Sequence, residues 1–546
     1  MKARERVRLE GVSLLKKASS TSAAVFASRI LGLVREQVFA YFFGAGMATD
    51  AFLVAYRIPG LLRDLFAEGA LSSAFVSVFS RESEEATRKS MVARMLVSLS
   101  AIVAVVCLLL FFFAGPLVEW MAPDFSLVTG KIELTTTLVR WFSPFLLFVT
   151  GAALSMGILN TLGHFFVPSL GPAAFNVASI VIGGGAAYVL RAEGFETMIV
   201  GFTIGSVIGG FCQWLLQWPL LTRKDYSPAH AFRSVIGGGH FRDALKDPAL
   251  KKIGWLMGPS ILAVAAVQIN VFVNMILATS LIEGSVSWLS YAYRLLYFPL
   301  GVFGVALSTA ALPSLSLLRL EKKFEDFEQT LCKALRLTWI LGLGAAAGLI
   351  AFRVPLISLI FEHGRFTHSD TLQTAMALTA FALALPALNT TKIFVQVFHA
   401  IDQVWIPSAV SLVFVISHYF IASWGASRYG HVGLALATAV TSVLNAVALA
   451  AVLKVMRHRL VDFETFKVFL GALTGVLILL GLDLVGYADW LMNLRESSKT
   501  VFVFATLASM MVFGALYLFL AAIPSKESRL WFKSLTRRLS GRSARS

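Results

Sequence analysis

The stretch SRILGLVREQVFAYFFGAG, residues 28–46, decides the fold class of this chain. It has the length and apolar character of a membrane-spanning helix, which needs about 20 predominantly apolar residues. It nevertheless places Arg29, Arg35 and Glu36 inside the apolar run. Each Arg at the centre of a spanning helix costs roughly 2.5–3.5 kcal/mol even on the lenient insertion scale. These side chains are therefore expected to face the protein interior or a water-filled cavity and not lipid.

The composition of the whole chain agrees with a membrane protein. Of its 546 residues, 57% are hydrophobic and only 14% are charged, whereas soluble domains have about 25% charged residues. Apolar runs of spanning length, with interruptions allowed where Pro or Gly could line a cavity, indicate about 14 transmembrane helices. The sequence thus predicts an all-α polytopic membrane protein. The spans centre near residues 32, 64, 102, 146, 178, 208, 267, 302, 346, 386, 416, 444, 476 and 511.

The basic residues are distributed unevenly between the two sides of the membrane. If both termini are cytoplasmic, the inside segments hold 31 Lys and Arg, and the outside loops hold 6. This bias follows the positive-inside rule and explains the net charge of +16 without a nucleic-acid partner. We therefore predict a multi-pass protein of the bacterial cytoplasmic (inner) membrane with both termini cytoplasmic.

Two pairs of matching segments indicate an internal repeat. The "AYR" that ends at Arg57 returns at Arg294, and the "VPS" of Pro168 matches the "IPS" of Pro407 at nearly the same separation along the chain. Six spans per copy return the chain to the same side, so the copies are expected as parallel six-helix lobes around a central cavity. The expected domains are the N-lobe (1–221), a cytoplasmic linker (222–252), the C-lobe (253–457), helices 13–14 (458–524) and a basic cytoplasmic tail (525–546).

The first two spans concentrate charged residues of both signs. Seven residues advance an α-helix by nearly two turns, so Arg29 and Glu36 are expected on one face. In the second span, Arg57, Asp64 and Glu68 fall on one stripe, with Arg63 beside it and Asp50 near the helix end. One interpretation is internal salt bridges with a structural role; the other is a charged cavity that receives an anionic substrate.

The second lobe favours the cavity. Its spans contain Arg294 and Lys392 but no Asp or Glu inside an apolar run. A guanidinium matches phosphate oxygens through two parallel hydrogen bonds, so an arginine-lined cavity suits a phosphate-bearing substrate better than a cationic drug. Lys392 could instead extend to the membrane interface.

Several long segments of this sequence resemble segments of one known family, and they occur in the same order along the chain. The segments SRILGLVREQVFAYFFGAGMATDAFLVAYRIPGLLRDLFAEGALSSAFVSVFS, ILNTLGHFFVPSLGP, YAYRLLYFPLGVFGVALSTAALPSLS, FEHGRFT and VGLALATAVTSVLNA resemble the lipid II flippase family MurJ, also called MviN. The resemblance implies a fourteen-helix inner-membrane transporter that moves undecaprenyl-pyrophosphate-linked peptidoglycan precursor, lipid II, to the outer leaflet by alternating access. It also implies that the last two helices form a groove for the lipid tail.

The resemblance further implies roles for individual residues. Arg29, Arg35, Arg63 and Arg294 fall on the family's substrate-binding arginines. Asp50, from the family's DAF motif, and Glu68, from its AEGA motif, also carry over. Cavity support or gating is then expected for a second set. This set is Glu36, Asp50, Arg57, Asp64, Glu68 and Lys392. Expected partners are lipid II, membrane lipids and other cell-wall synthesis proteins.

Three further expectations concern coupling and chemistry. Some family members are thought to bind sodium through carboxylates of the second lobe, where this chain offers only neutral oxygens of Asn270 and Asn274. A sodium site is therefore doubtful, and coupling to the membrane potential or to another ion stays open. No catalytic constellation is found, and the cysteines have no metal-like spacing, so neither an enzyme nor a metal or cofactor is expected. The alternative function is a cation-coupled drug exporter, or an exporter of another polyprenyl-linked oligosaccharide, of the same superfamily.

Overall fold

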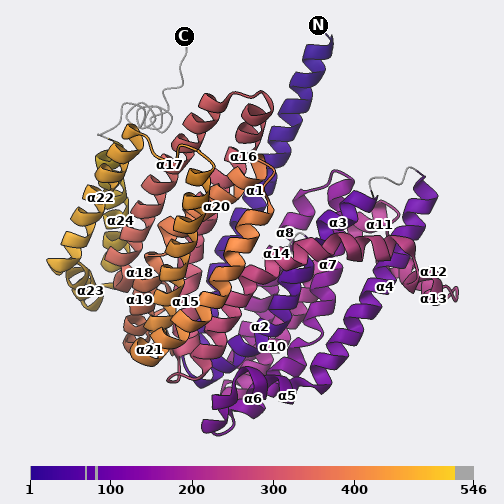
Figure 1. Ribbon diagram of the computed structural model, residues 1–546. Coiled ribbons are helices and arrows are strands. Elements are labelled where there is room, and N and C mark those ends of the chain that lie inside the picture. The colour runs from indigo at the N-terminus through magenta and orange to yellow at the C-terminus, as the bar shows by residue number, and fades with distance from the viewer. Residues whose placement is uncertain (1, 68–69, 80–83, 523–546) are drawn as a thin grey trace. The chain divides into compact units, whose positions relative to one another are not determined.

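The computed structural model of the chain describes residues 2–67, 70–79 and 84–522. Every regular element in these ranges is a helix, as Figure 1 shows, which confirms the all-α prediction. The chain forms two compact units, unit 1 with residues 1–271 and unit 2 with residues 272–546. Each unit is described by itself below.

Unit 1 contains the helices α1 to α13 and the part of α14 up to residue 271. Its first helix ends where Gly44 adopts a left-handed conformation. The Thr49 hydroxyl donates a hydrogen bond to the Gly44 carbonyl at 3.0 Å, so this carbonyl at the helix end has a partner. The elements are α1 (Lys2–Phe43), α2 (Met47–Ala67), α3 (Ala70–Phe79), α4 (Glu85–Phe112), α5 (Ala114–Met121), η1 (Pro123–Leu127), α6 (Lys131–Phe142), α7 (Phe145–Thr161), α8 (Phe166–Ala178), η2 (Ser179–Gly184), α9 (Gly185–Val189), η3 (Leu190–Ala192), α10 (Phe195–Leu215), α11 (Trp218–Arg223), α12 (Pro228–Ile236), α13 (Phe241–Leu245) and α14 (Pro248–Thr279).

Unit 2 contains the remainder of α14 and all later helices. Phe327, Leu331 and Leu335 of α17 form a core with buried side chains of α16, α20 and α21. The elements are α15 (Ser285–Pro299), η4 (Leu300–Gly304), α16 (Val305–Leu320), α17 (Phe324–Ala351), α18 (Arg353–Phe361), α19 (His368–Ala382), α20 (Leu385–Ala400), α21 (Trp405–Val455), α22 (Phe463–Leu484), α23 (Tyr487–Ser497) and α24 (Lys499–Ala522).

Helix boundaries recur between the two units at a constant offset. The separation between the first residue of α4, Glu85, and that of α17, Phe324, equals the separation between the first residue of α8, Phe166, and that of α21, Trp405. The short helices α5 and α18 follow α4 and α17 in the same way. Pro168 and Pro407 of the matching sequence segments are separated by this same offset. The helix pattern therefore supports the repeat, while the exact domain limits stay a prediction.

The segment 222–252, expected as a linker, is folded into short helices. Val235 of α12 and Ala244 of α13 pack against Val97 of α4. Arg94 of α4 donates a hydrogen bond to Asp247 at 2.5 Å. The segment is therefore attached to α4 of unit 1.

One long helix, α21, reverses its direction in the middle. Gly430 has φ 57° and ψ −138°, outside the helical region, and the helix is interrupted there. A Cβ on Gly433 would lie 2.0 Å from the carbonyl oxygen of Gly425, so the two halves pack closely where only glycine fits. The two halves correspond to the expected spans near residues 416 and 444.

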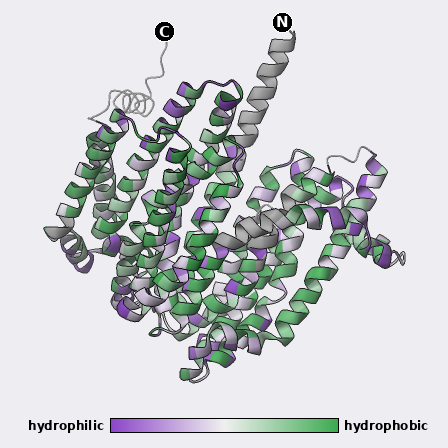
Figure 2. Ribbon diagram, viewed as in Figure 1, coloured by the Kyte–Doolittle hydropathy of each residue, from purple (hydrophilic) through white to green (hydrophobic). Residues whose placement is uncertain are grey.

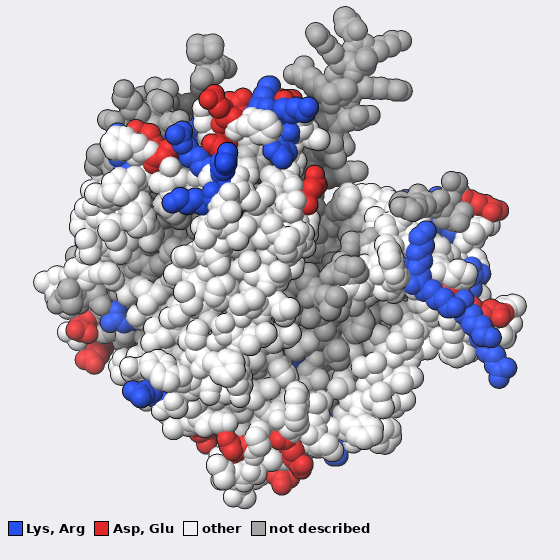
Figure 3. Space-filling view, viewed as in Figure 1, with Lys and Arg blue, Asp and Glu red and all other residues white. Residues whose placement is uncertain are grey.

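The outer surfaces of the helices suit a lipid environment. Nine helices in the described part of the chain are long and apolar enough to cross a membrane. Figure 2 shows hydrophobic residues along α4, α22 and α24, where Phe112, Phe504 and Met511 are exposed. On the face of unit 2 drawn in Figure 3, charged side chains gather toward helix ends and leave an uncharged band between them. These features identify an integral membrane protein; the count of fourteen spans agrees with this bundle and stays an expectation.

Candidate functional site

Arg35 lies on α1, where this helix packs against α8. Its guanidinium donates to the Glu36 carboxylate at 2.5 Å, and both side chains are largely buried. The guanidinium carbon also lies 5.0 Å from the centre of the Phe175 ring of α8, a cation–π contact. These two partners fix the orientation of the charge. Arg29, nearly two turns earlier on α1, is exposed within unit 1.

Arg63 of α2 joins the same group of side chains. It donates to the Tyr56 hydroxyl at 3.2 Å. Arg35 interacts electrostatically with both Tyr56 and Arg63. We call Arg35, Glu36, Tyr56 and Arg63 the arginine cluster. Among the described side chains, it brings the guanidinium groups of Arg35 and Arg63 together with the carboxylate of Glu36. Two predicted substrate-binding residues of different helices are thus neighbours.

Arg57, nearly two turns before Arg63, has a partner on another helix. It donates to the Gln268 side-chain oxygen of α14 at 2.6 Å. Both side chains are half-buried. The neutral amide orients the guanidinium without cancelling its charge. The salt bridges expected within the second span stay a prediction.

Asp50 has a structural partner at the start of α6. The Lys131 ammonium donates to its carboxylate at 3.1 Å, and the Lys131 and Asp50 side chains are 3% and 2% exposed, respectively. The ammonium also lies 4.1 Å from the centre of the Phe125 ring. A buried pair of this kind neutralises Asp50, so the geometry assigns it to holding α2 against α6.

Two predicted residues of the second span fall outside this description. Glu68 is not among the described residues, and Asp64 lies in α2 without a described side chain. Their expected roles in cavity support stay predictions.

Unit 2 positions Arg294 on α15 and Lys392 on α20, both half-buried. Beside Lys392 lies Asn389, which is 1% exposed and whose two amide atoms find no hydrogen-bond partner among the described residues. A Cβ on Gly304 would lie 2.2 Å from the Asn389 oxygen, so the π-helical η4 approaches this amide closely. A π-helical segment frequently marks a functional site.

Asn270 and Asn274, whose side-chain oxygens the sequence offers where some relatives are thought to bind sodium, have different surroundings in the structure. Asn274 belongs to a hydrogen-bonded group with His418 and Thr438 within unit 2. Asn270 has a buried side-chain oxygen with no partner among the described residues. No group of three or more His, Cys, Asp or Glu suited to a metal is found in the part of the chain that the structure describes.

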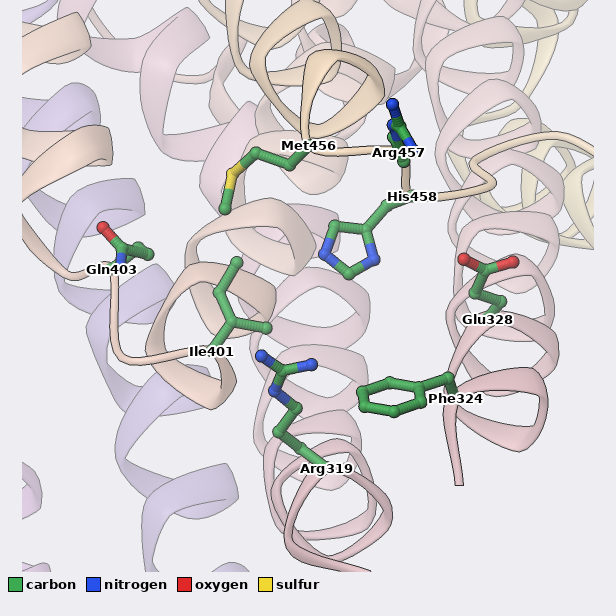
Figure 4. Close-up of a pocket in the computed structure, with 8 residues that line it drawn as sticks. All are labelled: Arg319, Phe324, Glu328, Ile401, Gln403, Met456, Arg457 and His458. Carbon is green, nitrogen blue, oxygen red and sulfur yellow. The ribbon is translucent and has the colours of Figure 1, made fainter. Parts of the chain in front are cut away.

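A pocket of about 330 Å³ lies at the ends of α16, α17, α20 and α21, and contains none of the predicted site residues. In Figure 4, Arg319 lies beside Phe324, with a guanidinium-to-ring distance of 5.2 Å, and Glu328 stands to one side. His458 packs on Phe327 at 5.6 Å between ring centres, and burial lowers its pKa. The remaining lining residues are Ile401, Gln403, Met456 and Arg457.

The family model described as "Lipid II flippase MurJ" matches residues 39–513. This chain belongs to the MurJ family. Curated relatives agree. The "Probable lipid II flippase MurJ" of Vibrio cholerae is 35% identical over 444 residues, covering 79% of this chain and 81% of the relative. The "Lipid II flippase MurJ" of Burkholderia cenocepacia is 32% identical over 445 residues, covering 80% and 83%.

Solved structures place the fold in the same family. The "Lipid II flippase MurJ, inward closed conformation" has a TM-score of 0.73 at 27% identity, covering 95% of this chain and 99% of that one. An inward-facing multidrug resistance MATE family transporter of the MOP superfamily has a TM-score of 0.64 at 15% identity, covering 80% and 99%, and shows the fold alone. The MurJ-family resemblance predicted from the sequence is therefore confirmed.

Sequence reasoning missed the partners of the predicted residues. Phe175, Gln268 and Lys131 contact Arg35, Arg57 and Asp50 from distant positions in the sequence. Their residue types carry no signal of these contacts. The charge distribution assigns Lys131 to the outside loops, although its ammonium is buried.

Proposed function

We propose that this MurJ-family chain is a lipid II flippase, which moves lipid-linked peptidoglycan precursor from the inner to the outer leaflet of the bacterial cytoplasmic membrane. The observation that carries the proposal is the arginine cluster, in which Arg35 and Arg63 lie together with the carboxylate of Glu36. The names of the curated relatives point to the same substrate.

The chemistry of the cluster suits a pyrophosphate. Two guanidinium groups held near each other repel, and a dianionic ligand between them removes this repulsion while accepting several charged hydrogen bonds. Glu36 leaves part of the donors of Arg35 free, because a guanidinium has five N–H groups. No covalent step is required of these residues: they bind and release a headgroup. Arg29 and Arg57 of unit 1 are proposed to extend the cationic path along which this headgroup moves. Arg294 of unit 2 is proposed as a further substrate-binding residue.

The remaining parts of the chain follow the same proposal. Both termini are proposed to be cytoplasmic, because 31 of 37 Lys and Arg outside the spans fall on the inside segments of this topology. The helices α22 and α24 are proposed to hold the lipid tail, since Leu477 and Met511 present exposed apolar side chains there. Other cell-wall synthesis proteins are proposed partners, because they supply and consume the precursor.

A drug exporter is the second candidate, favoured only by the likeness to MATE transporters, which concerns the fold. Such an exporter needs carboxylates to bind a cation. Among the described side chains, Glu36 and Asp50 are each engaged by a basic group. The cluster of two arginines disfavours a cationic substrate.

The proposal is tested by complementation of a bacterial strain depleted of its own flippase. The wild-type chain is expected to restore growth and to make the precursor accessible to an external probe. Variants of Arg35 and Arg63 are expected to insert normally and fail. A wild-type chain that is abundant in the membrane but leaves the precursor inaccessible would contradict the function.

A further inference from the structure

The ring of Tyr56 on α2 is held in place by buried aromatic side chains of unit 1. It stacks on Phe52, one turn earlier on the same helix, with ring centres 6.2 Å apart and an angle of 3° between the planes. Phe142 of α6 and Phe145 of α7 lie 5.4 and 5.8 Å from it, measured between ring centres. Each of these phenylalanines is at most 9% exposed. The packing of α2 against α6 and α7 therefore sets the position of the Tyr56 hydroxyl.

The same aromatic rings continue to the ring that contacts Arg35. Phe145 lies 5.7 Å from Phe175 of α8 between ring centres. The Arg35 guanidinium carbon lies 5.0 Å from the centre of the Phe175 ring. Packed rings thus connect Tyr56 to the side chain that orients Arg35. Since buried aromatic side chains are closely packed, this framework fixes the hydroxyl and the guanidinium relative to each other.

The Tyr56 hydroxyl has one hydrogen to donate and can accept hydrogen bonds as well. Arg63 donates to its oxygen at 3.2 Å, and this is the one hydrogen bond that the hydroxyl makes within the described part of the chain. Arg35 also interacts electrostatically with Tyr56. A guanidinium has donors and no acceptor, so neither arginine can accept the hydrogen of the hydroxyl. This hydrogen is therefore available to an acceptor from outside the described residues.

A phosphate oxygen supplies the acceptor that this arrangement lacks. Its negative charge attracts both guanidinium groups, and hydrogen bonds to an ionised acceptor are stronger than those between neutral groups. The bond that Tyr56 accepts from Arg63 also polarises the hydroxyl, which strengthens its own donation. The hydroxyl and the two guanidinium groups can thus bind one anionic group together.

We propose that Tyr56 is a further substrate-binding residue, whose hydroxyl donates a hydrogen bond directly to an oxygen of the pyrophosphate that Arg35 and Arg63 bind. The hydroxyl keeps accepting from Arg63 in this complex, so one side chain positions an arginine and contacts the headgroup. No covalent bond changes, and no proton is transferred. The inference rests on the proposed function, and it adds a neutral donor to the charged ones.

The binding test uses the full chain in lipid nanodiscs, with a fluorescent polyprenyl pyrophosphate as the probe. Tyr56→Phe keeps the ring and its aromatic contacts and removes only the hydroxyl. It is expected to weaken binding of the probe by roughly 10-fold or more, the usual effect of losing a hydrogen bond to a charged group. Tyr41→Phe removes an exposed hydroxyl from α1 and is expected to bind like wild type. Unchanged affinity of Tyr56→Phe would overturn the inference, because the hydroxyl would then bind water only.

A double variant separates direct donation from the positioning of Arg63. If Tyr56 acted only through Arg63, removal of the hydroxyl would have no effect once Arg63 is replaced by Ala. We expect Tyr56→Phe combined with Arg63→Ala to bind the probe more weakly than Arg63→Ala alone, in titrations extended until Arg63→Ala is half-saturated. The titration midpoint does not depend on the amount of folded protein. Equal midpoints of the two proteins would refute direct donation.

Translocation is measured in parallel, in liposomes with fluorescently labelled lipid II. A wild-type chain that binds the probe through Tyr56 but does not move lipid II would contradict the proposed function and leave the Tyr56 contact standing. A wild-type chain that moves lipid II, with Tyr56→Phe equal to it in both affinity and rate, would overturn the Tyr56 inference alone.

Discussion

The guanidinium of Arg35 is bonded to the carboxylate of Glu36, its neighbour in sequence, at 2.5 Å. Residues one apart on a helix point about 100° away from each other, so the long Arg side chain must bend back to reach its partner. The contact with Phe175 holds it in this position. The result is an oriented charge in a membrane-spanning segment, available to a ligand on the side that Glu36 does not cover.

Replacing Arg35 tests whether the fork of its guanidinium matters. Arg35→Ala is expected to lower flipping by roughly 10–150-fold, the equivalent of about 1.5–3 kcal/mol for charged hydrogen bonds. Arg35→Lys keeps the charge but not the bidentate geometry and is expected to recover only part of the activity. Complementation and precursor accessibility are measured with protein abundance. Arg191→Ala, at an exposed residue, is the control, and full activity of Arg35→Ala would make the residue dispensable.

The Arg57–Gln268 hydrogen bond of 2.6 Å gives a second prediction. Gln268→Leu removes the acceptor while leaving the charge of Arg57, so the guanidinium loses its orientation. We expect a reduced flipping rate, with Arg57→Ala more severe than Gln268→Leu. If Arg57 acts through this bond, the double variant should be no worse than Arg57→Ala alone. Additive losses in the rate assay would show that the two residues act independently.

The sequence predicts which segments carry the charged residues, but it does not predict which side chains they contact. Arg35 and Arg63 can be recognised in the sequence because they interrupt apolar runs. Helix geometry placed Glu36 on the face of Arg29, yet Glu36 is bonded to Arg35, since a long side chain reaches a neighbour outside its own face. Gln268 belongs to a helix far from Arg57 in the sequence and gains its role only through packing.

The repeat was predictable because two copies preserve their helix boundaries. Segment matches at Arg57 and Arg294 agree closely with the offset between α4 and α17. The separate spans near residues 416 and 444 predict a reversal between them, but the sequence does not show that it occurs at Gly430, because this glycine is one of many. Its identity is explained by the backbone conformation and by the close approach of Gly425 and Gly433, which are visible only in the folded chain.

The buried Asp50–Lys131 pair predicts a stability effect. Lys131→Met leaves the Asp50 carboxylate buried without its partner, and breaking such a pair costs about 3–5 kcal/mol. We expect a matching loss of stability against denaturant for the purified protein in detergent. Adding Asp50→Asn should restore part of the loss, because the buried negative charge that Lys131 neutralised is removed. A Lys131→Met protein as stable as wild type would show that water reaches the carboxylate.

Topology is tested with single cysteines in a chain whose three native cysteines are replaced. His240→Cys lies in the segment assigned to the cytoplasm, and Glu193→Cys lies in an exposed turn assigned to the opposite side. In intact cells, an impermeant thiol reagent is expected to label position 193 and not position 240. Both positions should be labelled after permeabilisation. The reverse pattern in intact cells would contradict cytoplasmic termini.

The link between α18 and α23 predicts a pH-dependent stability. Glu362 accepts hydrogen bonds from Thr371 and Arg495. Burial acts to raise the pKa of Glu362, but these hydrogen bonds and the charge of Arg495 prevail, so its pKa is lowered. A carboxyl whose folded pKa lies below its unfolded value, about 4.3, stabilises the folded state above that pH. This contribution is lost as the pH falls through the folded pKa.

The melting temperature of Glu362→Gln in detergent, compared with wild type between pH 7 and pH 3, measures this contribution. We expect the variant to be less stable at pH 7 and the difference to shrink as the pH falls below about 4.3. Glu496→Gln, at an exposed position of α23, is the matched control and should melt like wild type throughout. A difference that stays constant down to pH 3 would mean that Glu362 stabilises the protein by its shape and not by its charge.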